Sequence, residues 1–141
     1  MYKNILISVD LSSEEAEIRA IETAVEYARA FGSNLHIMTV VPDYGMSIVG
    51  SFFPKDHEQQ AIQHARESLH AFTSKYVPDD ISCRHIVAHG SIYRQILRYA
   101  KVVEADIIIL SAKRPGPEDY LIGPNAARVV RHATIPVLIV R

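Results

Sequence analysis

The stretch Ala105–Arg128, ADIIILSAKRPGPEDYLIGPNAAR, decides the fold of this chain. It begins with the apolar run Ile107–Leu110, which is typical of a short strand buried on both faces of a sheet. A loop rich in proline and glycine follows and carries Lys113 and Arg114, and Gly123 then leads into a helical pattern. A strand, a basic loop, a glycine and a helix N-terminus in this order predict a site for an anion. The phosphates of a nucleotide would lie there.

The composition is that of one globular domain spanning residues 1–141, with a formal net charge of −1. This charge gives no electrostatic reason to expect nucleic acid or a membrane as a partner. No apolar run approaches the ~20 residues of a membrane span. The first residues lead directly into a strand pattern without the apolar segment of a signal peptide. The single cysteine, Cys83, excludes an internal disulfide. We therefore expect a cytoplasmic protein.

Five apolar segments alternate with helical patterns along the chain. Ser12 and Glu15 have the spacing of a capping box, which predicts that the first helix begins near Ser12 and that Ser12 caps it. Gly32 is placed to end this helix, and the last helix is predicted at Asn125–His132. The predicted strands are Asn4–Val9, Asn34–Val41, Ser82–Ala88, Asp106–Ser111 and Val137–Val140.

Strands that alternate with helices predict an all-parallel sheet with helices on both faces, here a five-stranded doubly wound α/β domain. Ligands of such sheets bind beyond the carboxyl ends of the strands, at the point where the strand order reverses. For the order 3-2-1-4-5 this point lies between the first and fourth strands. Asp10 would then lie opposite Leu110 and Ser111.

The chain resembles the universal stress protein family, and within it the short, single-domain F and G branch. The resemblance runs nearly end to end. It rests on four segments: YKNILISVDLS at the start, HGSIYRQI before the third long helix, ADIIILSAKRP, and YLIGPNAARVVRHATIPVLIVR at the end. It implies the doubly wound fold and the binding of ATP or a related adenine nucleotide by a stress-response protein.

The loop after the fourth strand departs from the family's pattern, Gly-x2-Gly-x9-Gly-Ser/Thr. Ser111 stands at the first glycine and Arg114 at or near the second, while Gly123 matches the third. Pro124 replaces the Ser or Thr, and the loop is one residue short. Serine and arginine restrict the backbone conformations that glycine allows. Proline removes a hydroxyl and an N–H that could have contacted a phosphate.

Several donors remain in this segment. The backbone N–H groups of Asn125 and Ala126 are available at the start of the helix, and Lys113 and Arg114 can supply positive charge. The F and G branch has a similarly altered loop, and nucleotide binding is still associated with it. The alternative is a solvated loop with two incidental cations.

The end of the first strand supplies the other half of the expected site, Ser8, Val9 and Asp10. The resemblance implies that Asp10 contacts ribose hydroxyls or a phosphate-bound Mg²⁺. The alternative is that Asp10 only caps the following turn, but the predicted cap at Ser12 favours the ligand role. The backbone of Val40 matches the position that meets adenine.

Other features give little evidence of catalysis or of a resident metal. The seven histidines include no H-E-x-x-H motif and no helical pair at i, i+4. Cys83 is interpreted as a small packed residue. No general base is identifiable near the loop, so we expect no enzyme and keep slow ATP hydrolysis or self-phosphorylation as a weaker hypothesis.

The closing strand, Val137–Val140, is apolar and would lie at a sheet edge, which invites pairing with another chain. The resemblance implies a two-fold homodimer through antiparallel pairing of this strand. The alternative is a strand covered by the chain's own helices. The apolar segment Met46–Phe53 could be a lid or a partner surface. A second hypothesis for the whole chain is a homodimeric interaction protein that has lost the nucleotide.

Overall fold

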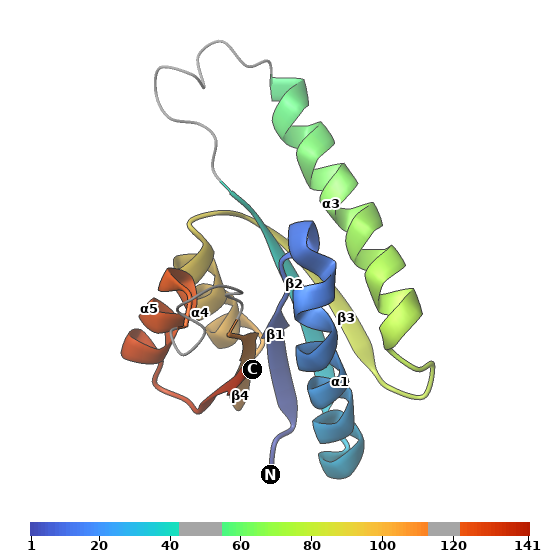
Figure 1. The fold of residues 1–141 in the computed structure, drawn as a ribbon, viewed down its shortest axis with the longest axis vertical. Coiled ribbons are helices and arrows are strands. Elements are labelled where there is room, and N and C mark those ends of the chain that lie inside the picture. Colours follow the sequence, from blue (N-terminus) through green and yellow to red (C-terminus); the bar gives the residue numbers. More distant parts are fainter. Residues whose placement is uncertain (43–54, 113–121) are drawn as a thin grey trace.

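Five parallel strands form one sheet in the order β3-β2-β1-β4-β5 in the computed structural model, which describes residues 1–42, 55–112 and 122–141 (Figure 1). The predicted fold class and strand order are confirmed. The strands are β1 (Asn4–Ser8), β2 (Asn34–Pro42), β3 (Cys83–Gly90), β4 (Ile107–Ser111) and β5 (Val137–Val140).

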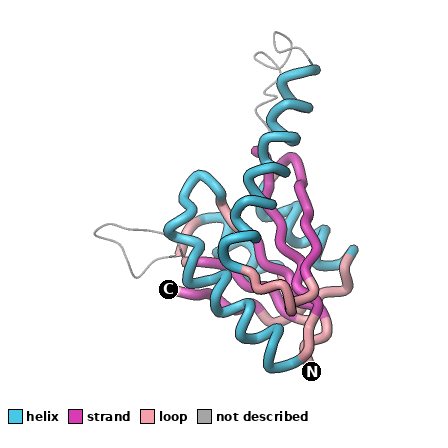
Figure 2. The backbone as a smooth tube through the Cα atoms, turned by 90° about the vertical axis from the view of Figure 1, so that its right-hand side faces the viewer, coloured by secondary structure: helices cyan, strands magenta, loops and turns pink. Residues whose placement is uncertain are grey.

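Helices cover both faces of the sheet (Figures 1 and 2). The helices α1 and α3 pack on one face, and α4 and α5 pack on the other. Both views also show α3 extending past the carboxyl ends of the strands. The helical elements are the short 3₁₀ helix η1 (Leu11–Ser13), α1 (Glu14–Phe31), α3 (Lys55–Tyr76), α4 (Ile92–Val102) and α5 (Pro124–His132).

The strand β1 lies at the centre of the sheet, and its register aligns Ile7 with Ile37 of β2 and Ile109 of β4. All three isoleucines are fully buried beneath α1 and α3. Burying such a side chain stabilises the folded state by about 1.5–3 kcal/mol. The continuous apolar run in β4 follows from this position, because neighbouring residues of β4 face opposite helical layers and all are buried.

The start of α1 differs from the prediction. Asp10, not Ser12, is the capping residue, and it caps η1, which lies between β1 and α1. The N-cap of α1 is Ser13, whose side chain makes no capping hydrogen bond. The predicted capping box is therefore wrong, because Ser12 lies within η1. The C-terminal end agrees with the prediction, since Gly32 adopts a left-handed conformation with φ 64°.

The strands β2 and β3 run further than predicted, and they pair as far as Pro42 and Gly90. Pro42 lies just beyond the predicted end of this strand at Val41, yet the pairing register includes it. Gly90 has φ 124°, a conformation that side chains rarely adopt, so glycine is required there. This extra length brings the end of β2 closer to the site described below.

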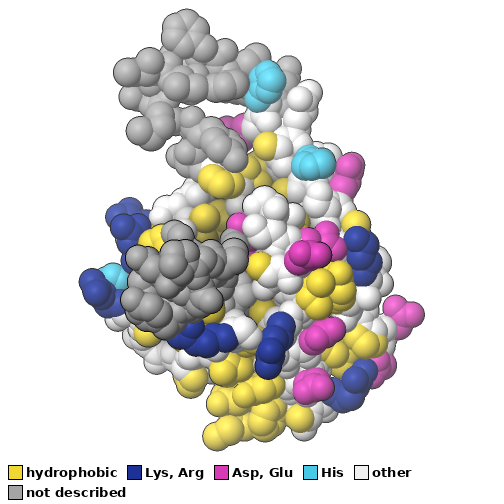
Figure 3. Space-filling model, in the orientation of Figure 1, with side chains coloured by type: hydrophobic (Ala, Val, Ile, Leu, Met, Phe, Trp, Pro, Cys, Tyr) yellow, Lys and Arg dark blue, Asp and Glu magenta, His cyan; other side chains and the backbone are white. Residues whose placement is uncertain are grey.

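Charged side chains are unevenly distributed over the surface. Figure 3 shows acidic side chains over α1 and α3 and basic side chains on the side formed by α5. In the described part of the chain, no helix combines the length and apolarity needed to cross a membrane.

We expect the buried His36 to make folding stability sensitive to acid. It is 5% exposed, its Nε2 donates to Oδ1 of Asn4 at 3.2 Å, and its Nδ1 has no hydrogen-bond partner among the described residues. Burial lowers the pKa of His36 below its ordinary value of 6.5, and the positive charge of Arg84 lowers it further. Below pH 6.5 the unfolded chain takes up a proton that the folded chain resists, so this contribution is complete above pH 6.5 and is lost as the pH falls.

We therefore expect the urea midpoint to fall between pH 7.5 and pH 5.5, and to fall less in His36→Gln, because glutamine does not titrate. The exposed His64 provides the matched control, His64→Gln, which should keep the wild-type pH difference. If the urea midpoint fell equally in wild type and in His36→Gln, His36 would not be a source of the acid sensitivity.

Candidate functional site

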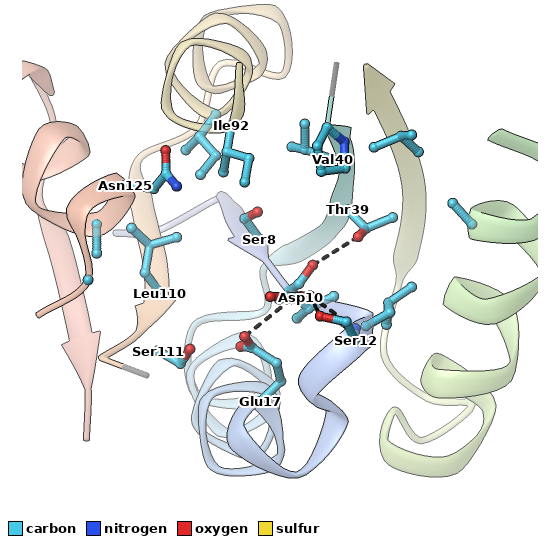
Figure 4. A pocket seen from close by; sticks show the side chains of 18 of the residues that line it. Ser8, Asp10, Ser12, Glu17, Thr39, Val40, Ile92, Leu110, Ser111 and Asn125 are labelled. Carbon is cyan, nitrogen blue, oxygen red and sulfur yellow. Dashed lines mark hydrogen bonds between the residues drawn. The ribbon is translucent and has the colours of Figure 1, made fainter. Parts of the chain in front are cut away.

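A cavity of about 640 Å³ opens beyond the carboxyl ends of β1, β2 and β4 (Figure 4). This is the point at which the strand order reverses, since β2 and β4 flank β1 on opposite sides. The ends of the three strands form one wall. The first turns of α4 and α5, η1 and the inner side of α3 contribute the others.

The cavity brings together every predicted site residue that the structure describes. These residues come from three segments of the chain that are far apart in sequence. Lys113, Arg114 and the segment 46–53 lie outside the described residues. The ten that line the cavity are Ser8, Val9, Asp10, Val40, Leu110, Ser111, Gly123, Pro124, Asn125 and Ala126.

Asp10 is held by contacts on both its backbone and its side chain. Its Oδ1 accepts from the backbone N of Ser12 at 3.0 Å and from the Ser12 hydroxyl at 2.6 Å. Its own N–H donates to Oε1 of Glu17 at 3.2 Å. The capping role that the sequence left as an alternative is therefore real. It also fixes the carboxylate at the cavity wall.

A buried hydrogen bond ties the ends of β1 and β2 together. The hydroxyl of Thr39, which is 6% exposed, donates to the carbonyl of Val9 at 2.9 Å. The N–H of Val9 donates to the carbonyl of Met38, also at 2.9 Å. The cavity wall next to Val40 is therefore built on fixed backbone, which suits recognition through the main chain.

The start of α5 presents backbone donors to the cavity. Its N-cap, Gly123, makes no side-chain capping bond, and its carbonyl accepts the N–H of Ala127 at 2.9 Å. The N–H groups of Asn125 and Ala126 precede this bond and have no acceptor within the helix. Both residues line the cavity. Pro124 stands at the start of the helix and has no N–H, so it supplies no such donor. The helix itself loses nothing, because an N–H at this position has no partner within the helix.

Glu17 is a cavity residue that the sequence analysis missed. It is 1% exposed and lies on the buried side of α1 together with Ala20, Ile21 and Ala24. Figure 4 shows its carboxylate directed toward Asp10. The sequence could have indicated this, because Glu17 falls within the apolar stripe of α1, and a glutamate is rarely buried without a specific contact. The lining that α3 and α4 supply, including His64, Ser68, Ile92 and Ile96, was also missed.

The described part of the cavity lining is acidic. Asp10 and Glu17 contribute carboxylates, His64 is the one histidine, and the described lining contains no lysine or arginine. Among the described residues, a phosphate would therefore depend on the backbone donors of α5 or on a bound cation.

His85, His89 and Cys83 have contacts with residues that do not line this cavity. Nδ1 of His89 lies 3.2 Å from Oε1 of Glu58, and Nε2 of His85 lies 2.7 Å from the Thr73 hydroxyl. Among the described residues, no group of three or more potential ligands could hold a metal ion. Cys83 packs against the α1–α3 side of the core, and burial raises the pKa of its thiol to about 11. This agrees with the interpretation of Cys83 as a packed residue.

Comparison with known proteins gives one consistent family. Residues 1–141 match the model of the universal stress protein family. Universal stress protein G of Escherichia coli O157:H7 is 29% identical to this chain over 143 residues, and the match covers 100% of both chains.

Solved structures show the same fold. Universal stress protein UspA of Lactobacillus plantarum is 26% identical, with a TM-score of 0.80 over 99% of this chain and 98% of that one. A universal stress protein of Archaeoglobus fulgidus, solved in complex with dAMP, is 20% identical, with a TM-score of 0.60 over 99% and 98% of the two chains. This chain therefore belongs to the universal stress protein family.

Proposed function

We propose that this protein binds ATP or a related adenine nucleotide in the cavity beyond β1, β2 and β4. The observation that carries the proposal is the convergence of ten predicted residues, from three distant segments, around this one cavity. Its volume of about 640 Å³ lies within the range of small-molecule sites, roughly 300–1,000 Å³. The dAMP complex of the A. fulgidus protein, which shares the fold, supports an adenine nucleotide as the ligand.

The phosphates, the ribose and the adenine would each contact a different group of the residues that line the cavity. The phosphates would lie at the start of α5, where the N–H groups of Asn125 and Ala126 and the positive end of the helix dipole favour an anion. Asp10 would accept hydrogen bonds from the ribose hydroxyls. The backbone of Val40 would meet the adenine, with the apolar side chains of Ile92 and Ile96 available to contact its ring.

The donor set also suits a nucleotide that carries Mg²⁺. Magnesium usually binds through one or two carboxylates together with substrate phosphates and waters. Asp10 provides such a carboxylate at the cavity wall. A bound cation would also offset the repulsion between the phosphates and the carboxylates of Asp10 and Glu17. Lys113 and Arg114, from the loop before α5, would add positive charge.

The cellular role that follows is a nucleotide-linked stress-response module in the cytoplasm. Occupancy would change the conformation of the protein or its choice of partner. We do not assign catalysis, because the proposed contacts position and neutralise the nucleotide but supply no identified general base for attack on a phosphate. The whole chain, residues 1–141, would act as one domain.

The direct test is to denature freshly purified protein, identify any released nucleotide, and titrate the stripped protein with AMP, ATP and ATP–Mg²⁺ by calorimetry. We expect binding near one nucleotide per chain, with GTP as the control for base selectivity. No released nucleotide and no heat with any adenine nucleotide would contradict the proposal. The nucleotide-free interaction protein would then be the better hypothesis.

We also propose that the protein is a homodimer joined through β5. The N–H groups of Ile108 and Ala112 donate to the carbonyls of Pro136 and Val140, so the even-numbered residues of β5 pair with β4. In a parallel ladder the backbone groups of Ile139 then point away from β4, toward the open edge. An antiparallel copy of β5 could pair with them.

This arrangement allows a matched pair of variants. Ile139→Ala removes most of the side chain but keeps the outward N–H, whereas Ile139→Pro removes that N–H as well. By light scattering coupled to size-exclusion chromatography, we expect Ile139→Ala to remain dimeric and Ile139→Pro to be monomeric. A monomeric wild-type protein, or a dimeric Ile139→Pro variant, would contradict pairing through β5.

A further inference from the structure

The helices α4 and α5 carry a concentration of positive charge. They contain five of the fifteen Lys and Arg residues of the chain and none of its sixteen Asp and Glu residues. The net charge of the whole protein is only −1, so this local excess is not visible in the total. The five residues are Arg94, Arg98, Lys101, Arg128 and Arg131.

The cations all lie on the outer sides of the two helices. Ile96 and Ala100 of α4 and Ala126 and Val129 of α5 are buried against the sheet. The five cationic residues are exposed. On α4 they follow one another at steps of four and three residues, which places them on a single side of the helix. We call this surface, formed by the five residues, the basic face.

Contacts around Tyr93 join the two helices into one surface. The guanidinium of Arg94 lies 5.8 Å from the centre of the Tyr93 ring, and that of Arg128 lies 5.2 Å from the same ring. The His132 ring stacks on Tyr93 with a centroid distance of 6.1 Å. Nε of Arg94 donates to the Tyr93 hydroxyl at 3.1 Å, and this bond and the neighbouring arginines lower the pKa of Tyr93. The local potential is therefore positive.

Two exposed apolar side chains lie on the same two helices. Val102 at the end of α4 is 62% exposed, and Val130 of α5 is 46% exposed. The charged phosphate backbone of a nucleic acid would gain little from contact with valine side chains. Single-stranded nucleic acid also needs uncovered aromatic rings on which bases stack. Arginines already lie over the rings of Tyr93 and Tyr99. Carboxylates interspersed with aliphatic side chains complement both the charge of the five cations and the apolar side chain of Val102.

We propose that the basic face is a docking surface for an acidic, amphipathic segment of another protein. Carboxylates of the segment would pair with the arginines, which can hold them through two parallel hydrogen bonds. Its aliphatic side chains would cover Val102, which directly follows Lys101 at the end of α4. Such charge complementarity accelerates association and selects the partner.

The same helices connect the basic face with the nucleotide cavity. Ile92 and Ile96 of α4 and Asn125 and Ala126 of α5 line the cavity from the inner sides of these helices. A partner on the outer side would therefore contact elements that also contact the nucleotide. The partner segment would contact only the outward-facing residues of α4 and α5. Its docking therefore does not depend on whether the protein binds a nucleotide.

The test uses the full-length protein without nucleotide and a fluorescein-labelled helical peptide of Glu and Leu with the Leu residues on one side. We expect saturable binding by fluorescence anisotropy that weakens as salt is added. The double variant Arg98→Glu/Arg131→Glu should bind about tenfold more weakly or worse. Its control, Arg19→Glu/Arg66→Glu, makes the same change of net charge at exposed sites on α1 and α3 and should bind like wild type.

Further arms identify the partner class and guard against misfolding. A peptide with Ser in place of Leu should bind more weakly than the amphipathic one. If the Glu variant does not melt like wild type, Arg98→Gln/Arg131→Gln replaces it. Equal weakening in the target and control variants would overturn the proposal. Tighter binding of oligo(dT) at the same arginines would overturn the proposal in favour of nucleic acid. Tighter binding of phosphatidylserine vesicles there would overturn it in favour of a membrane. Self-association through these arginines would overturn it in favour of a second copy of this chain.

Discussion

Gly123→Val is expected to weaken adenine nucleotide binding by about ten- to a hundredfold while leaving the fold intact. Gly123 has φ −64° and ψ 161°, an extended conformation open to any residue, and a Cβ built on it would meet no heavy atom of the described residues within 4 Å. The protein should therefore tolerate valine. The branched side chain, however, would occupy the cavity wall beside the N–H groups of Asn125 and Ala126. Losing one hydrogen bond to a charged group costs about 1.5–3 kcal/mol, which corresponds to this loss of affinity.

The measurement is calorimetric titration with ATP–Mg²⁺, accompanied by a thermal melt. Gly123→Ala is the matched control, because it also replaces the glycine but adds only a methyl group, and we expect a smaller loss. A wild-type dissociation constant in a folded Gly123→Val variant would mean that the phosphates do not lie at the start of α5. Gly123 has a negative φ, so the expected loss comes from the size of the new side chain and not from backbone strain.

The sheet could be predicted because its signals are local and strong. The run Ile107–Leu110 is apolar at every position, which only a strand covered on both faces requires. Once strands alternate with helices, the right-handed crossover rule leaves few topologies. The carboxyl ends of the strands then meet at one edge of the sheet. Asp10 and Ser111 could therefore be assigned to one site, although they are about a hundred positions apart in the sequence.

The contacts within the site were harder to predict, because they depend on short irregular turns and on packing. The 3₁₀ helix between β1 and α1 shifts the cap from Ser12 to Asp10, and the capping-box spacing does not reveal such an insertion. Glu17 has the chemistry of a surface residue, and only the packing of α1 on the sheet shows that it is buried. The contribution of His64 and Ser68 depends on how α3 lies over the strand ends, which periodicity cannot specify.

Phe72→Ala is expected to lower the free energy of unfolding by about 3–5 kcal/mol, the usual cost of removing a buried phenylalanine. Phe72 is 1% exposed and belongs to the core between α1, α3 and the sheet. Its ring lies 4.9 Å from that of Tyr76, one turn along α3. A domain of this size is stable by about 5–15 kcal/mol, so the variant would lose a large share of its stability. Urea unfolding at pH 7.5 measures the change.

The position of Phe72 also connects core packing with the site. Nearer the start of α3, four residues line the cavity: Ala61, His64, Ala65 and Ser68. A variant in which α3 is held less firmly at Phe72 should therefore also bind nucleotide more weakly. Ser74→Ala, an exposed change two residues away, should stay within about 0.5 kcal/mol of wild type and keep its affinity. If Phe72→Ala cost less than about 1 kcal/mol, α3 would not be packed on the sheet as described. If the variant folds and loses stability but keeps its nucleotide affinity, packing at Phe72 does not influence the residues of α3 that line the cavity.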